Sequence, residues 1–277
     1  MAIKPKFEGW YYKQQANGKT LAVIPGRSST CAFILVVTDK TSYNIPFKLS
    51  EYRKGKILKI GNNLFSSNGI RLRINTKNIS IHGDLKYQNL TPINGDIMGL
   101  FRFFPMECRH GIVSMKHDVA GKIEINGATW DFTNGTGYIE TDSGVSFPEK
   151  YTWVQSNNFK QNCSIMAAVA KIPFAGFSFW GCICVVWING KEYRLATYKG
   201  AKIRRVQHNL IELRQGKYRL IVKTNQHQAH KLAAPKLGVM SRIIKESASC
   251  PAKFLFTKGN KVLFAGTSQH ASYEYEF

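Results

Sequence analysis

The sequence predicts an all-β fold with little helix, and three observations support this prediction. Asn-Gly occurs six times, beginning at Asn17, Asn68, Asn94, Asn126, Asn134 and Asn189. This dipeptide favours the positive φ angles of tight hairpin turns. Short runs rich in β-branched and aromatic residues lie between these turns, and several of them alternate apolar with polar residues, which is typical of half-buried antiparallel strands.

The predicted strands can be placed in order along the chain. We expect them at residues 20–25, 31–38, 70–74, 193–198, 218–223, 253–257 and 261–265. In the run at 70–74, alternation places Arg71 and Arg73 on the outer face, where they need no partner.

Helical patterning is scarce. One short helix is predicted at residues 235–247, because Leu237, Met240, Ile243 and Ile244 would share one of its faces. Asp96 is predicted to cap a short turn through residues 97–101.

Residues 163–188 form a long apolar segment in which Lys171 is the single charged residue. Its length would fit a membrane span, but Pro173, Gly176 and Gly181 interrupt it. We therefore expect two buried strands joined by a turn at residues 173–176. The aromatic residues of these strands would line a hydrophobic cavity; they are Phe174, Phe177, Phe179, Trp180 and Trp187.

A chain of 277 residues is long enough for two modest domains. A second section of the chain begins near Gly111 and runs through two Asn-Gly turns. We predict two halves, residues 1–110 and 111–277, each able to form a small barrel.

The net charge is unusual: 39 basic and 17 acidic residues give +22. Such a surface attracts polyanions, which include nucleic acids and anionic lipid headgroups. Nucleic-acid binding would need aromatic residues on an exposed face, whereas most aromatic residues here lie in apolar runs. Peripheral contact with an anionic membrane is therefore the better expectation, and nucleic-acid binding is disfavoured.

The six cysteines indicate core thiols. No CxxC pair occurs, and Cys182 and Cys184 would share one face of a strand, which suits a core better than a zinc site. We therefore predict no metal. Residues 1–10 show no apolar run after their lysines, unlike a secretory signal, and a cytoplasmic protein is expected.

The chemistry is predicted to lie in residues 134–159. Strand periodicity places Tyr138, Glu140 and Asp142 on one face, and Tyr151, Trp153, Gln155 and Asn157 on one face of a second strand. A carboxylic acid in an apolar pocket has a raised pKa and becomes able to donate a proton. The alternative is that Glu140 and Asp142 flank a turn and pair with lysine or arginine.

Two further clusters contain ionisable residues. Glu107, Arg109 and His110 could form a buried polar network or, alternatively, a purely structural salt bridge between the halves. Glu8 is a third acid, beside the aromatic Trp10. The GxSxG, GxGxxG and P-loop motifs are absent, so no nucleotide cofactor is indicated.

Five segments, in order and spread over nearly the whole chain, show a family resemblance. They are FEGWYYK (7–13), MECRHGIVSMKHD (106–118), NGTGYIETDSGVSFPEKYTWVQSNNF (134–159), EYRLATYKGAKI (192–203) and KLAAPKLGVMSRIIKE (231–246). They resemble the tocopherol cyclase family. The resemblance implies two lipocalin-like β-barrel halves packed together. It also implies an intramolecular lyase or isomerase that closes a prenylated hydroquinone to a chromanol without a cofactor.

Such a reaction needs a neutral carboxylic acid in an apolar site, because an alkene is a very weak base. From residue chemistry we expect Glu140 or Asp142 as the acid, with Glu8 in reserve. The aromatic residues expected to face the carbocation are Trp10, Tyr138, Tyr151 and Trp153. The residues expected to hold the phenol are Gln155, Asn157 or His110.

The chain departs from the family pattern at Ser143, where the family usually has tryptophan after the acidic residue. If that tryptophan lines the pocket, this chain lacks one aromatic face. The alternative function is therefore a non-catalytic carrier of an isoprenoid or other lipid, which needs the same pocket but no acid.

Overall fold

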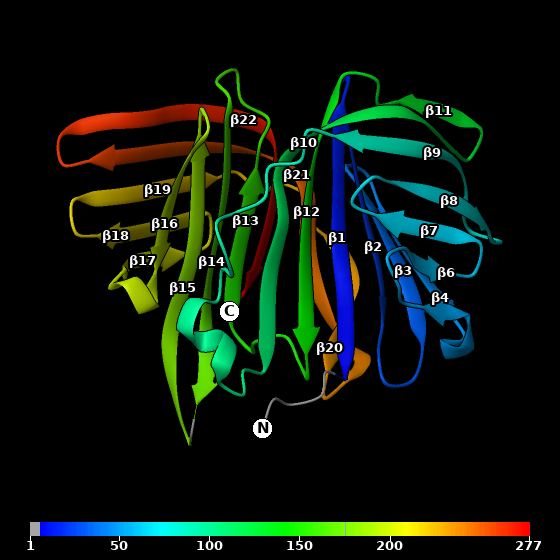
Figure 1. The fold of residues 1–277 in the computed structure, drawn as a ribbon, viewed down its shortest axis with the longest axis horizontal. Helices are drawn as coiled ribbons and strands as arrows, with labels where there is room; N and C mark the ends of the chain where they lie inside the picture. The colour runs from blue at the N-terminus through cyan, green and yellow to red at the C-terminus, as the bar shows by residue number, and fades with distance from the viewer. Residues whose placement is uncertain (1–5, 175) are drawn as a thin grey trace.

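The computed structural model describes residues 6–174 and 176–277. It is all-β, as predicted, with two antiparallel sheets (Figure 1). The first sheet contains β1 (Phe7–Ala16), β2 (Lys19–Arg27), β3 (Ala32–Thr38), β4 (Ser42–Phe47), β5 (Tyr52–Arg53), β6 (Leu58–Ile60), β7 (Asn63–Ser66), β8 (Gly69–Asn75), β9 (Ser80–Gln88), β10 (Cys108–Ile125), β11 (Ala128–Asp131) and β12 (Gly135–Gly144). The second contains β13 (Tyr151–Ser156), β14 (Cys163–Phe174), β15 (Phe177–Ile188), β16 (Lys191–Ala196), β17 (Lys202–Gln207), β18 (Leu210–Gln215), β19 (Tyr218–Thr224), β20 (His230–Lys236), β21 (Val239–Lys258) and β22 (Lys261–Glu276).

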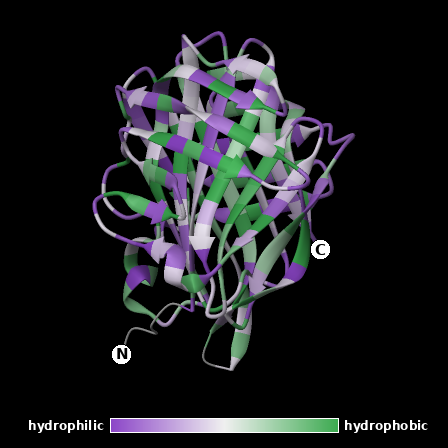
Figure 2. Ribbon diagram, turned by 90° about the vertical axis from the view of Figure 1, so that its right-hand side faces the viewer, coloured by the Kyte–Doolittle hydropathy of each residue, from purple (hydrophilic) through white to green (hydrophobic). Residues whose placement is uncertain are grey.

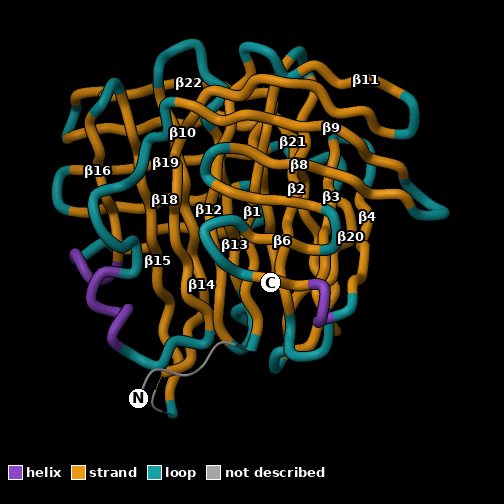
Figure 3. Tube along the Cα trace, turned by 45° about the vertical axis from the view of Figure 1, so that its right-hand side comes forward, coloured by secondary structure: helices purple, strands orange, loops and turns teal. Residues whose placement is uncertain are grey.

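The helical content of the described residues is three short 3-10 turns, shown as purple pieces in Figure 3. They are η1 (Leu49–Glu51), η2 (Gly99–Phe103) and η3 (Thr197–Lys199). Asp96 precedes η2, and its Oδ1 accepts a hydrogen bond from the backbone N–H of Met98 at 2.7 Å. The predicted capped turn is thus present, shifted two residues along the chain.

The helix predicted at residues 235–247 is wrong. This segment forms the end of β20, a tight turn and the start of β21. Leu237 and Gly238 have φ angles of 51° and 84°, and positive φ at both central residues is the requirement of a type I′ hairpin turn. Apolar residues that would share a helical face therefore lie along a hairpin.

The chain changes sheet between β12 and β13, at residues 145–150, and not near residue 110. The predicted boundary lies inside β10, which pairs with β9 and β12 of the first sheet. The prediction failed because the Asn-Gly turns after residue 110 continue the first sheet.

The strand path of each sheet is open. It runs from β4 to β5 in the first sheet and from β16 to β17 in the second. In Figure 1, strands near the middle, such as β1, β12 and β13, run vertically, and β6–β9 and β17–β19 cross them at the two sides. Each half is thus a strongly curved sheet, and within the described residues its end strands are not paired into a closed barrel.

The alternation of residues along the strands produces three apolar cores. One lies within the first half, around Val23 and Leu72, and one lies within the second half, around Val186 and Phe256. The third draws residues from both sheets and therefore lies between them. In Figure 2, hydrophobic and hydrophilic residues follow one another along individual strands.

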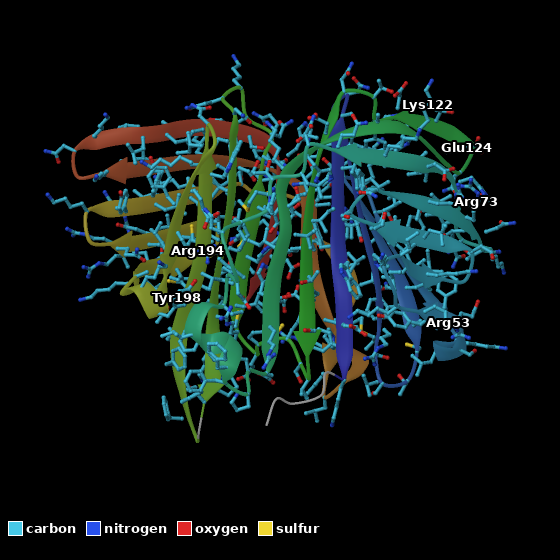
Figure 4. The ribbon with its side chains drawn as sticks, viewed as in Figure 1. Arg53, Arg73, Lys122, Glu124, Arg194 and Tyr198 are labelled. Carbon is cyan, nitrogen blue, oxygen red and sulfur yellow. The ribbon has the colours of Figure 1, made fainter. Side chains whose placement is uncertain are left out.

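The basic residues of β8 lie on the outer surface, as predicted. Arg71 and Arg73 are exposed, and both pair with Asp84, at 2.6 and 2.7 Å. Arg73 projects outward at the edge of the first half, near Lys122 and Glu124 of β10 (Figure 4). The high net charge is therefore carried, at least here, by a solvated face.

The apolar segment at residues 163–188 forms two strands, as predicted: β14 and β15 pair along their whole length. Residue 175 of the predicted turn lies outside the described residues. Among residues 6–174 and 176–277, no helix is long and apolar enough to cross a membrane.

Candidate active site

A cavity of about 180 Å³ lies between the two sheets. Its walls are largely apolar and include Phe33, Leu35, Ile183, Leu232 and Ile244, which come from both halves. The pocket expected from the sequence is therefore present, but it lies between the halves and not inside either of them.

The strands β14 and β15 line the cavity with different residues from those predicted. Small and aliphatic side chains face it, among them Ala168, Ile172 and Ile183. The five aromatic residues that we expected there, Phe174, Phe177, Phe179, Trp180 and Trp187, are not among the lining residues.

Glu140 is the acid at the centre of one wall. It lies within β12, is 4% exposed and lines the cavity. Its Oε2 accepts hydrogen bonds from the Tyr138 hydroxyl at 2.5 Å and from the Trp153 indole N–H at 3.2 Å. No hydrogen bond of the described residues reaches Oε1. One oxygen is thus held by the protein, and the other is free for a ligand.

His110 and Asp142 lie beside Glu140. They are Cα partners across β10 and β12, and the His110 Nδ1 lies 3.0 Å from Asp142 Oδ1. The Nε2 of His110 lies 3.3 Å from Glu140 Oε2, although it does not have the alignment of a hydrogen bond. The imidazole therefore lies between two carboxyl groups.

The pKa values of these groups are shifted by burial and by one another. Burial acts to lower the pKa of His110, but the carboxylates of Glu140 and Asp142 outweigh it and raise that pKa well above its usual value. Burial raises the pKa of Glu140, and the neighbouring His110 opposes this. The arrangement favours a charged imidazole beside an unusually weak carboxylic acid.

The opposite wall carries two acids that sequence reasoning missed. Glu246 of β21 and Glu274 of β22 line the cavity. Tyr11 donates to Glu246 Oε1 at 2.5 Å, and Tyr151 donates to Glu274 Oε2. Period-two alternation from Met240 through Ile244 would have pointed to Glu246, but the helix predicted there concealed it.

His110, Glu140 and Asp142 are also the described residues best placed to hold a metal ion. Each offers one ligand atom, and these atoms lie within 4.8 Å of one another. Tyr138 and Trp153 donate to Glu140 Oε2, so Oε1 is the oxygen of Glu140 that would be open to a cation.

The structure brings six of the predicted site residues to the cavity wall. They are Trp10, His110, Glu140, Asp142, Tyr151 and Trp153. Tyr138 is completely buried behind Glu140 and acts on it through the hydroxyl group. The alternative in which Glu140 and Asp142 flank a turn does not hold, because both lie within β12.

Glu8 lies apart from this group. It is not among the lining residues, and it pairs with Arg27 at 2.7 Å and with Lys54. Burial acts to raise the pKa of Glu8, but the hydrogen bonds from Lys54 and Arg27 lower it overall. An ionised, paired carboxylate is not suited to donate a proton to an alkene.

The remaining predicted residues also lie away from the cavity wall. The Gln155 Oε1 accepts from the Lys13 ammonium at 3.1 Å, and Asn157 Nδ2 donates to the Gly137 carbonyl at 2.7 Å. Both tie the two sheets together beyond the cavity. Ser143 alternates with Asp142 along β12 and is not a lining residue, so its substitution for tryptophan removes no aromatic face from this wall.

The sequence model of the tocopherol cyclase-like family matches residues 49–274. The chain belongs to this family. The match includes strands of both sheets and every cavity-lining carboxyl group of the tocopherol cyclase-like chain. The strands β1 to β4, with Glu8, Trp10 and Tyr11, precede it. No curated protein sequence matches the chain significantly.

Solved structures share the fold of this tocopherol cyclase-like protein. A protein of Nitrosomonas europaea assigned as AttH has a TM-score of 0.61 and 11% identity, over 98% of this chain and 93% of its own. Kievitone hydratase from Nectria haematococca has a TM-score of 0.55 and 11% identity, over 96% and 88%. CghA, solved with Sch210972, has a TM-score of 0.60 and 9% identity, over 98% and 88%. At such low identities these similarities establish the fold alone.

Proposed function

We propose that this protein catalyses a cofactor-independent, acid-initiated ring closure, in which a prenylated hydroquinone or related isoprenoid becomes a chromanol-type product. One observation supports the proposal above all: Glu140 is buried in the wall of a largely apolar cavity, and its Oε1 accepts no hydrogen bond from the described residues. Membership of the tocopherol cyclase-like family and the fold shared with a hydratase agree with it.

Glu140 is the proposed acid. When it is protonated, Oε2 acts as the acceptor for Tyr138 and Trp153, so the proton resides on Oε1, on the free side. Transfer of this proton to a trisubstituted alkene forms a C–H bond and leaves a tertiary carbocation. The apolar walls exclude water, which would otherwise capture the cation.

Aromatic side chains at the cavity stabilise this cation. Trp153 and Tyr11 pack edge to face with ring centroids 5.3 Å apart, and Tyr151 and Trp10 also line the cavity. Each aromatic face in contact with a cation contributes about 0.5–2 kcal/mol.

Ring closure completes the reaction. The phenol oxygen adds to the cation, a C–O bond forms, and the phenolic proton leaves. A carboxylate in the cavity wall accepts that proton. It gains the proton that Glu140 has lost, so return of this proton to Glu140, directly or through solvent, restores the starting state with no net proton consumed.

Incubation of the purified protein with a geranylgeranylated or phytylated hydroquinone tests the proposal. A chromanol product supports the cyclase. A tightly bound but unchanged hydroquinone would support the carrier alternative, which needs the cavity but not the acid.

We also propose that the substrate reaches the cavity from an anionic membrane. Large apolar side chains are exposed around η2 and the facing end of β15, among them Leu100 (64%), Phe103 (70%) and Phe177 (58%). Phe101 of η2 lines the cavity, and Figure 1 shows η2 beside the ends of β14 and β15. A basic protein with exposed aromatic residues at its cavity fits a lipid surface. The six free thiols fit the cytoplasm.

A further inference from the structure

Glu246 and Glu274 form a second pair of buried carboxyl groups in the cavity, on the wall opposite Glu140. They are Cα partners on neighbouring strands, so their side chains project side by side. Glu246 is completely buried, and Glu274 is 9% exposed. Two carboxylates so placed repel each other, and burial raises the pKa of both, to about 7 for Glu246. The acid step proposed for Glu140 does not use either group.

The two oxygens of Glu246 have different environments. Oε1 accepts a hydrogen bond from the Tyr11 hydroxyl at 2.5 Å. Oε2 is buried and has no hydrogen-bond partner among the described residues. Buried carboxyl oxygens are normally paired, and leaving one unpaired is unfavourable. Because Glu246 lines the cavity, a ligand in the cavity can supply the missing partner.

None of the neighbouring polar groups of the described residues donates to Oε2. The Lys13 ammonium donates to Gln155 Oε1 at 3.1 Å and to the His270 carbonyl at 2.9 Å. Tyr151 donates to Glu274. The wall around Glu246 is otherwise apolar and includes Ile244 and Leu232, so a partner for Oε2 would be a single polar group on a largely apolar molecule.

We propose that Oε2 of Glu246 is a hydroxyl subsite, which selects apolar ligands that carry a free hydroxyl group. Tyr11 fixes Oε1 and thereby determines which oxygen faces the ligand. The inference rests on the proposed function in one respect: in a cyclase this hydroxyl is the phenol that closes the ring. Glu140 and Glu246 then contact the alkene and the hydroxyl of one molecule from opposite sheets.

The test compares two ligands that cannot react. One is a phenol with a saturated isoprenoid chain in the ortho position, and the other is its methyl ether. Their dissociation constants are measured by quenching of tryptophan fluorescence, well above pH 7, so that Glu246 is ionised. We expect the wild-type protein to bind the phenol about tenfold more tightly, which is the loss expected from one buried hydrogen bond.

Glu246→Gln is the diagnostic variant. Tyr11 retains the amide oxygen, so the amide N–H₂ faces the ligand and can donate to a phenol or an ether alike. In Glu246→Gln, the ratio of the dissociation constants of ether and phenol should fall to nearly one. Glu124→Gln, a change at an exposed residue of β10, should leave the ratio unchanged. If steric exclusion of the methyl group caused the preference, Glu246→Gln would retain it.

The ratio of the two dissociation constants for the wild-type protein tests the proposal even if Glu246→Gln does not fold. Equal affinities for phenol and ether, a preference that survives in Glu246→Gln, or failure of the wild-type protein to bind either ligand would overturn the proposal. A preference that depends on Glu246 without any chromanol production would leave the hydroxyl subsite standing and reject the cyclase.

Discussion

Trp153 in the second sheet donates its indole N–H across the cavity to Glu140 in the first, at 3.2 Å. Tyr11 of the first sheet donates in the opposite direction, to Glu246 of the second, at 2.5 Å. The rings of Trp153 and Tyr11 contact each other. Each carboxyl group is therefore oriented by an aromatic residue from the opposite sheet, so the site exists only when the two halves are packed together.

Glu140→Gln should reduce the rate of cyclisation by at least about 100-fold, because it removes the proton donor. Glu8→Gln should change the rate by less than about threefold, since Glu8 is ion-paired outside the cavity wall. Rates of product formation, together with circular dichroism to verify folding, make the comparison. If Glu8→Gln reduced the rate more than Glu140→Gln, Glu140 would not be the acid.

The rate should fall as the pH rises, because Glu140 acts in its protonated form. Burial raises its pKa, so activity should persist at pH values at which an ordinary glutamate is already ionised. A profile of kcat against pH measures this decline, which forms the alkaline limb of the profile. A rate that increased with pH over the same range would be incompatible with Glu140 as the acid.

Trp153→Phe should keep an aromatic ring in the cavity but remove a donor to Glu140. Loss of a donor to the carboxylate raises its pKa, so the alkaline limb of the kcat profile should move to higher pH, and kcat should fall about tenfold. Trp187→Phe, outside the cavity wall, is the control. An unshifted limb in Trp153→Phe would mean that the indole only fills space.

Glu246 should make the stability of the protein depend on pH. Its pKa is raised from 4.5 to about 7 by burial, so the folded state binds more protons than the unfolded state in this interval. The stabilisation is complete below pH 4.5 and is lost as the pH rises to about 7, by on the order of 1–3 kcal/mol.

Urea denaturation of the wild-type protein and Glu246→Gln across this interval measures the effect. Burial lowers the pKa of Lys13 from 10.5 to about 7, so the contribution of Lys13 to the pH dependence begins at the upper end of this interval and extends above it. Parallel pH dependences of the two proteins would show that Glu246 is not protonated in the folded state.

Phe103→Ser combined with Phe177→Ser should weaken binding to vesicles that contain anionic lipid, by about tenfold or more. Binding should also weaken as the salt concentration rises. Cosedimentation measures both effects, with Val262→Ser, another exposed apolar residue, as the control. Equal loss in the control would indicate nonspecific adsorption.

The sequence predicted elements whose signals are local. The hairpin turns at Asn17, Asn126 and Asn189, the hairpin of β14 and β15, and the shared face of Glu140 and Asp142 all follow from short-range sequence signals. The helix predicted at residues 235–247 failed because the same apolar spacing also fits a hairpin with Gly238 in its turn.

The other half of the site depends on contacts between distant segments. Tyr11 and Glu246 are 235 residues apart, and no periodicity connects them. Likewise, pairing with Arg27 and Lys54 removed Glu8 from the candidate acids. The position of the cavity between the sheets required the packing of both halves, which the sequence pattern does not specify.

Turnover in deuterium oxide tests the central claim most directly. The protein is incubated there with a geranylgeranylated hydroquinone, and the product is analysed by mass spectrometry and NMR. Protonation of the alkene by Glu140, whose proton exchanges with solvent, predicts a chromanol with a single deuterium on the ring carbon next to the new C–O bond, and no such product from Glu140→Gln. A chromanol without deuterium at that carbon, or recovery of unchanged hydroquinone, would contradict acid-initiated cyclisation.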